Sequence, residues 1–134
     1  MNATSAEKKR LTKNQRMVLD VLESEPVPMT AYSILDHLRH DGLKAPLQVY
    51  RALDKLTELR AVHRLESLNS FVACQQADCQ LHQTVAFTIC DACGHVDEIS
   101  NNQLSRKLAK LAKTDGFLLS KSTVELRGCC RSCQ

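Results

Sequence analysis

Residues 46–74 read PLQVYRALDKLTELRAVHRLESLNSFVAC, and this stretch decides the fold of the first half of the chain. Pro46 is suited to the first position of a helix, and the apolar residues after it recur at helical spacing. These apolar positions are Val49, Leu53 and Leu56. Two β-like runs, 62–66 and 71–74, then flank the polar turn 67–70, a pattern typical of a hairpin. The stretch therefore predicts a helix followed directly by a β-hairpin.

Two further helices are predicted upstream. The first covers residues 11–25 and ends at Pro26, where the ring blocks helix continuation. The second follows the N-cap candidate Thr30 and ends at Gly42. Three helices followed by a hairpin form the outline of a winged helix-turn-helix.

The second half has a different pattern. Strands are predicted at 84–90, 95–99 and 117–126, with a helix at 102–113 between the last two. The polar stretch before them has no apolar period and is interpreted as a linker. We therefore predict an α+β protein made of three parts, which are a winged-helix domain at 1–76, a hinge linker at 77–83 and a small α/β domain at 84–134. The last part, with about fifty residues, is too small to be stable without a further constraint.

Composition narrows the class of protein. The 134 residues contain no Trp, three Phe and two Tyr, so a metal or a partner subunit is expected to help hold a small core. The charged N-terminus lacks the apolar stretch of a signal peptide, and no run approaches the roughly 18–20 apolar residues that span a bilayer. A cytoplasmic location without membrane attachment is expected. In that reducing compartment, seven cysteines indicate metal ligation rather than disulfides.

Four cysteines form two Cys-x2-Cys pairs, Cys90 with Cys93 and Cys130 with Cys133. This spacing turns both thiolates of a pair toward one ion, and two pairs complete a closed tetrahedral zinc site. Zinc would tie the last predicted strand to the first, so that binding energy becomes folding energy. A redox pair is the alternative, and Cys129 could substitute for its neighbour as a ligand.

A second metal site is predicted from scattered residues. If the hairpin turn is centred between Leu68 and Asn69, His63 lies directly opposite Cys74, with Cβ atoms roughly 4.5–5.5 Å apart. A register slip of one residue would separate the two side chains.

Two residues outside the hairpin could complete that site. His82 lies in the linker and Glu98 on a following strand. One sulfur, two nitrogens and one oxygen suit zinc better than manganese or magnesium. Cys79 and His95 are rival ligands.

Basic residues indicate nucleic acid as a partner. Lys13 and Arg16 would contact phosphates and carry little sequence information, although a solvated terminus is the alternative. Gln48, Arg51 and Lys55 share the outward face of the third helix, where a recognition helix meets the major groove. In that groove Arg51 could pair with guanine.

Arg64 on the hairpin could reach the adjacent groove. One winged helix buries too little surface for tight operator binding. A homodimer on palindromic double-stranded DNA is therefore predicted.

The chain resembles the ferric uptake regulator family over nearly its whole length. The matching pieces are Leu11-Thr12 with Gln15-Arg16, Thr30-Ala31, Val49-Tyr50-Arg51-Ala52-Leu53, Cys90-Asp91-Ala92-Cys93-Gly94, Gly116-Phe117 and Gly128. The resemblance implies a dimeric, metal-dependent repressor with a winged helix, a C-terminal dimerisation domain and a structural zinc on the cysteine pairs. Tyr50 resembles the family's tyrosine that contacts thymine methyls or the DNA backbone.

Within the family, the second half is most similar to the zinc uptake regulators. The resemblance implies a regulatory zinc at the hinge, held by residues that match His63, Cys74, His82 and Glu98. It therefore implies two zinc ions per protomer and a zinc-loaded homodimer that represses zinc uptake genes. The sequence His82-Gln83-Thr84, where many members have a second His, argues against the iron, manganese and peroxide branches.

Two other classes of protein fit parts of this sequence. One is an iron or manganese regulator of the same family, and the other is a zinc-stapled module that binds proteins rather than DNA. An enzyme with a small organic substrate is not expected. Zinc deaminases need His-x-Glu and Pro-Cys-x-x-Cys, and this sequence contains neither motif. Thiol oxidoreductases place one Cys-x-x-Cys near a βαβ pattern, whereas this sequence has two separate pairs.

Overall fold

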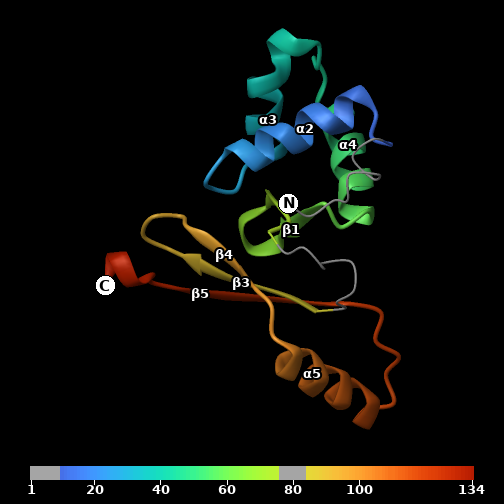
Figure 1. The fold of residues 1–134 in the computed structure, drawn as a ribbon, viewed down its shortest axis with the longest axis vertical. Helices are drawn as coiled ribbons and strands as arrows, with labels where there is room; N and C mark the ends of the chain where they lie inside the picture. Colours follow the sequence, from blue (N-terminus) through green and yellow to red (C-terminus); the bar gives the residue numbers. More distant parts are fainter. Residues whose placement is uncertain (1–9, 76–83) are drawn as a thin grey trace. The chain divides into compact units, whose positions relative to one another are not determined.

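The computed structural model describes residues 10–75 and 84–134. The chain divides into two compact units, Met1–Ala77 and Asp78–Gln134 (Figure 1). His82 and Cys79 lie outside the described residues. Within the described ranges, no helix is long and apolar enough to cross a membrane.

The first unit contains the three predicted helices. They are α2 (Lys13–Ser24), α3 (Ala31–Leu38) and α4 (Pro46–Glu58). The helix predicted from residue 11 starts at Lys13, because Thr12 is its N-cap and accepts a hydrogen bond from the Gln15 N–H at 3.2 Å. Thr30 caps α3 in the same way, as predicted, by accepting from the Ser33 N–H. Gly42 ends the short turn η1 (Arg39–Asp41) with φ +106°.

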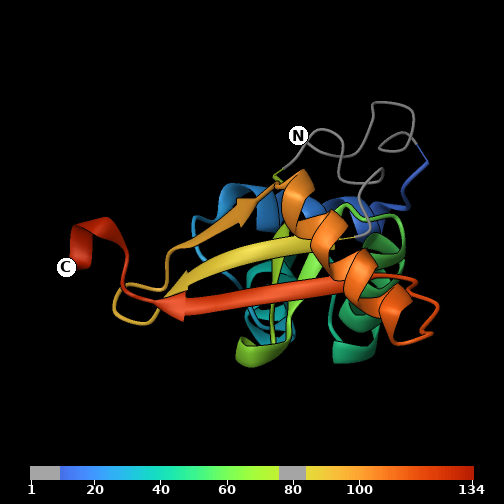
Figure 2. The same cartoon turned by 90° about the horizontal axis from the view of Figure 1, so that it is seen from below.

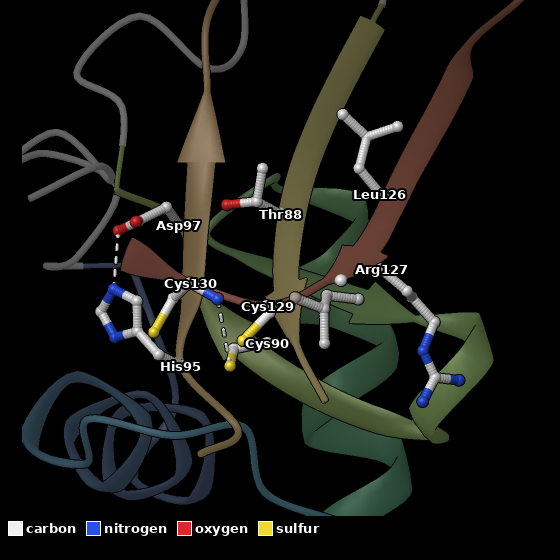
Figure 3. Close-up of a pocket in the computed structure, with 10 residues that line it drawn as sticks. Thr88, Cys90, His95, Asp97, Leu126, Arg127, Cys129 and Cys130 are labelled. Carbon is white, nitrogen blue, oxygen red and sulfur yellow. Dashed lines mark hydrogen bonds and ion pairs between the residues drawn. The ribbon is translucent and has the colours of Figure 1, made fainter. Parts of the chain in front are cut away.

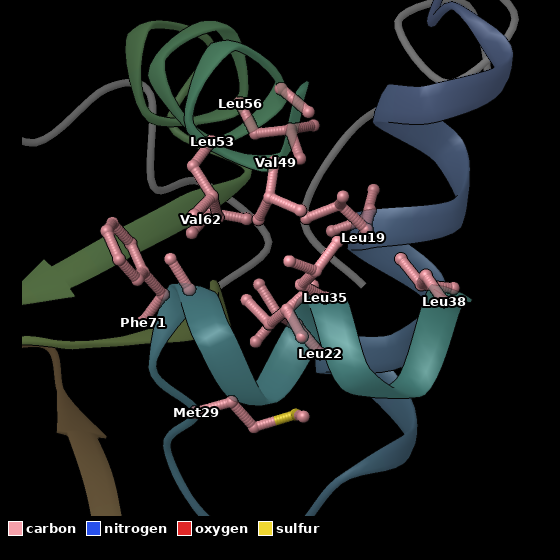
Figure 4. Packing of buried hydrophobic residues seen from close by; sticks show 14 of the residues in the cluster. Leu19, Leu22, Met29, Leu35, Leu38, Val49, Leu53, Leu56, Val62 and Phe71 are labelled. Carbon is pink, nitrogen blue, oxygen red and sulfur yellow. The ribbon is translucent and has the colours of Figure 1, made fainter. Parts of the chain in front are cut away.

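The core of this unit forms where α2, α3 and α4 meet. Figure 4 shows Val49, Leu53 and Leu56 directed from α4 into the cluster. Each of the three side chains is at most 1% exposed. Their burial confirms the predicted apolar stripe, and it leaves the opposite face of α4 available to a ligand.

The hairpin consists of β1 (Val62–Leu65) and β2 (Ser70–Ala73), which pair antiparallel. The predicted register was wrong: His63 lies opposite Val72, not Cys74. The reason is the turn, in which η2 (Glu66–Leu68) is followed by Asn69 in the left-handed conformation at φ +48°. This geometry centres the loop one residue earlier than predicted. Because the pairing shifts by two residues, His63 and Cys74 keep the same face of the hairpin.

A third segment joins the hairpin, and the sequence pattern did not indicate it. Met29, just before α3, exchanges two backbone hydrogen bonds with Phe71 of β2, at 3.1 and 2.8 Å. The hairpin is therefore fastened to the helical part through backbone as well as side chains.

The second unit is a three-stranded sheet with a crossover helix. Its elements are β3 (Thr84–Cys90), β4 (Val96–Ile99), α5 (Asn102–Thr114) and β5 (Ser122–Gly128). Figure 2 shows β3 (yellow) between β4 (orange) and β5 (red). Strand β3 pairs antiparallel with β4 and parallel with β5.

The strand predicted at 117–126 instead spans Ser122–Gly128. Gly116, at φ +69°, ends α5, and the Phe117 N–H still bonds to the Ala112 carbonyl at 2.8 Å. The chain must then return to the start of β3, since a parallel partner begins level with Thr84. Leu118 lies on this return path and is 95% exposed.

Candidate metal centre and nucleic-acid interface

The two cysteine pairs converge because β3 and β5 run parallel. The last register pair is Cys90 with Gly128, so both strands end at the same edge and continue into their cysteine turns. The sulfurs of Cys90, Cys93, Cys130 and Cys133 all lie within 4.8 Å of one another. The 3.8 Å between the sulfurs of Cys93 and Cys130 matches the edge of about 3.8 Å that a Zn–S distance of about 2.3 Å gives in a tetrahedron. The donor set and its spacing therefore fit zinc.

Backbone amides favour ionisation of the innermost cysteine. The N–H groups of Cys130 and Cys93 each donate to the sulfur of Cys90 at 3.4 Å. They stabilise its thiolate and lower the pKa of Cys90 to about 6. In contrast, hydrogen bonds of its side chain to Cys130, Cys93 and Cys90 raise the pKa of Cys133 to about 12. Four close thiols ionise together only when a cation offsets their charge.

Cys129 is not among the four cysteines whose sulfurs converge. It lines a hollow of about 180 Å³ that also includes Thr88, Leu126 and the ion pair between His95 Nε2 and Asp97 Oδ1 at 3.1 Å (Figure 3). His95 is likewise absent from the two groups of converging ligand atoms found among the described residues.

The hairpin brings together two of the residues predicted for the second site. The ligand atoms of His63 and Cys74 lie within 4.8 Å of each other, and both side chains are buried. The Cys74 N–H donates to the Ala61 carbonyl at 2.9 Å, which fixes the backbone just beyond β2. Glu98 belongs to the other unit, on β4 opposite Phe87, and is also buried. His82 lies outside the described residues.

Four predicted DNA-contacting residues are exposed on α4: Gln48, Tyr50, Arg51 and Lys55. Tyr50 is 40% exposed, so its ring is not part of the core. The side-chain oxygen of Gln48 accepts from the N–H groups of Lys44 and Ala45 at 3.0 and 3.2 Å. Gln48 therefore caps the N-terminus of α4, a role that the sequence pattern did not indicate.

The remaining predicted DNA contacts are also on the surface. Lys13 and Arg16 are exposed on the first turns of α2. Arg64 is exposed on β1, where it donates to Asn69 Oδ1 at 3.0 Å and approaches Glu66 at 3.7 Å. These contacts hold the Arg64 side chain over the hairpin turn.

The sequence pattern also gave no sign of a pair beside the cysteines. Arg127 donates to Asp91 at 2.7 Å, although 36 residues separate them. No local signal could have found this pair; only the register of β3 against β5 could have done so.

Comparison with known proteins agrees with this geometry. The model of the ferric uptake regulator family matches residues 6–127. The zinc uptake regulation protein of Escherichia coli K12 is 38% identical over 125 residues, which cover 92% of this chain and 72% of that protein. A crystal structure of holo XcZur is 39% identical with a TM-score of 0.85, covering 92% of this chain and 86% of that one. A zinc uptake regulator complexed with zinc and DNA is 38% identical with a TM-score of 0.86, covering 92% and 83%. The chain belongs to the ferric uptake regulator family.

Proposed function

We propose that this chain is a zinc-responsive, DNA-binding transcriptional repressor that controls zinc uptake genes and acts as a zinc-loaded homodimer. One observation carries the proposal: 92% of the chain matches, at a TM-score of 0.86, a zinc uptake regulator complexed with zinc and DNA. The winged-helix unit and the four converging cysteines are the features that such a regulator requires.

The DNA contacts are proposed for the outward face of α4 and for the basic residues around it. Arg51 would pair with a guanine edge, and Tyr50 would contact a thymine methyl or the backbone. Lys13 and Arg16 would bind phosphates, while Arg64 would reach the adjacent groove. Gln48 and Lys55 complete the proposed face. Two such units in a homodimer would bind a palindromic operator.

We assign different roles to the proposed parts of the chain. Residues 1–76 would bind DNA, residues 77–83 would form the hinge, and residues 84–134 would dimerise. The four cysteines would hold a structural zinc, since a tetrahedral site filled by four thiolates leaves no open coordination position. That zinc would stabilise a unit with a small core.

A second, regulatory zinc is proposed on His63, Cys74, His82 and Glu98. The support from structure is the approach of His63 and Cys74 on one face of the hairpin; the other two come from the family resemblance. Zinc, when bound, supplies a single charge centre that favours conformations in which its ligands converge. Because the four residues come from the hairpin, the linker and the second domain, their convergence would limit how the DNA-binding domains are oriented. Apo protein would then release the operator.

The test is zinc content and DNA binding of matched variants. The wild-type protein should hold two zinc ions per protomer, one inert and one exchangeable with a competing chelator. Cys74→Ser should lose the exchangeable ion and zinc-dependent DNA binding, while Cys129→Ser should keep both. If Cys74→Ser binds DNA normally at low free zinc, the proposed switch is wrong. If iron or manganese activates binding better than zinc, another branch of the family is indicated.

A further inference from the structure

The guanidinium of Arg127 crosses from β5 to a carboxylate inside the first cysteine pair. Its Nε and Nη2 both donate to Asp91 Oδ1, at 2.9 and 2.7 Å. The Asp91 N–H donates to the Gly128 carbonyl at 2.8 Å. Asp91 lies directly after Cys90, and Arg127 lies three residues before Cys130. The same two turns are therefore joined through both the backbone and the side chain of Asp91.

A second link joins the same turns through sulfur. The Cys130 N–H donates to the sulfur of Cys90 at 3.4 Å. Arg127 thus lies at the point where β5 passes into the second cysteine turn, and it contacts the first turn there. Separation of the two turns would have to break its charge-assisted hydrogen bonds, which are stronger than neutral ones.

The charges at this end of the sheet favour a cation beside Asp91. Four thiolates and one Zn(II) sum to a net charge of about −2, since each thiolate contributes one negative charge. Asp91 adds another negative charge between two of the ligands. Without a cation beside it, that carboxylate would repel the loaded site. The positive charge of the Arg127 guanidinium offsets the negative charge of Asp91. The net charge of the zinc and its four thiolates is not altered by this pair.

We infer that Arg127 is a positioning residue that acts through Asp91 to slow zinc release from the four-cysteine site. The inference rests on the structural zinc of the proposed function. It assigns to Arg127 no contact with the metal. The side chains of Arg127 and Asp91 are 48% and 51% exposed, so solvent screens their attraction and the effect on release is moderate.

The experiment measures the rate at which zinc leaves the fully loaded, reduced full-length protein into an excess of a chromophoric chelator. Arg127→Gln should release zinc about fivefold faster, the upper end of what an exposed ion pair supports. Asp91→Asn should stay within about twofold of wild type, because it removes the repulsive charge together with the link. The double variant should resemble Asp91→Asn rather than Arg127→Gln. Arg127→Lys should fall in between, since an ammonium keeps the charge but not the guanidinium geometry.

Arg39→Gln is the matched control. Arg39 pairs with Asp36 at 3.1 Å within one helical region of the first unit, with comparable exposure, so its loss should leave zinc release unchanged. In 1 M salt the difference between Arg127→Gln and wild type should shrink, because exposed charges are screened at that ionic strength. If the pair only linked the two turns, Asp91→Asn would release zinc as fast as Arg127→Gln, because either change removes the link.

Two results would overturn the inference. One is a release rate for Arg127→Gln equal to that of wild type and of Arg39→Gln. The other is a double variant as fast as, or faster than, Arg127→Gln, because removal of the Asp91 carboxylate would then give no rescue. If wild-type protein holds no zinc on these cysteines at all, the proposed structural site fails instead, and zinc content distinguishes that case before any rate is measured.

Discussion

Replacing Cys90 with serine should strongly weaken zinc binding at the four-cysteine site. Cys90 is 4% exposed and receives two backbone N–H donors, which favour its thiolate. A serine hydroxyl does not ionise near neutral pH and does not replace a thiolate ligand. The variant would therefore leave three thiolates around the ion.

The size of the effect follows from the donor set. Structural zinc sites in small domains bind with about 10–16 kcal/mol, so one of four equal ligands accounts for about 2.5–4 kcal/mol. A loss of that size weakens zinc binding by roughly 10²–10³-fold. Cys129→Ser, which removes an exposed thiol outside the cluster, should change zinc binding less than about threefold.

The assay is competition for zinc against a chelator of known affinity under reducing conditions, with thermal unfolding followed in parallel. Cys90→Ser should lose zinc at chelator concentrations that leave wild type and Cys129→Ser loaded. Unchanged affinity in Cys90→Ser would refute the reasoning.

Three further predictions concern the winged helix. Arg51→Ala should weaken binding to the operator by about 1–3 kcal/mol and relax base preference at one position, as measured by fluorescence anisotropy with base-substituted duplexes; equal loss on every sequence would contradict a base contact. Lys13→Gln should weaken binding to all sequences alike and lower the salt slope by about one, and an unchanged slope would remove Lys13 from the phosphate contacts. Leu56→Ala should destabilise the protein by about 2–5 kcal/mol in denaturant titrations, because its side chain is fully buried in the helical core; a loss below about 1 kcal/mol would contradict that packing.

The sequence predicted the helices and the cysteine site because those features depend on short-range spacing. The cap at Thr30 and the stripe of Val49, Leu53 and Leu56 are readable within one or two turns of chain, whereas the cap at Thr12 was not predicted. The two cysteine pairs are similarly local, and the sulfurs converge as expected.

The errors arose where turn geometry or a distant partner decides the outcome. The hairpin register was wrong because the left-handed Asn69 moved the loop centre by one residue. The predicted start of β5 was wrong because the true start depends on a parallel partner strand that begins at Thr84. The pairing of Arg127 with Asp91 needs the same register. His63 and Cys74 lie close together despite the error in the predicted register, because a two-residue shift keeps both side chains on the same face of the hairpin.

The most direct test of the zinc-responsive repressor is operator affinity across a series of buffered free-zinc concentrations, with zinc content measured in the same samples. The four-cysteine site is expected to stay loaded throughout, while DNA affinity rises steeply as the second ion binds. DNA affinity that stays constant while the zinc content rises from one to two ions per protomer would contradict regulation by zinc.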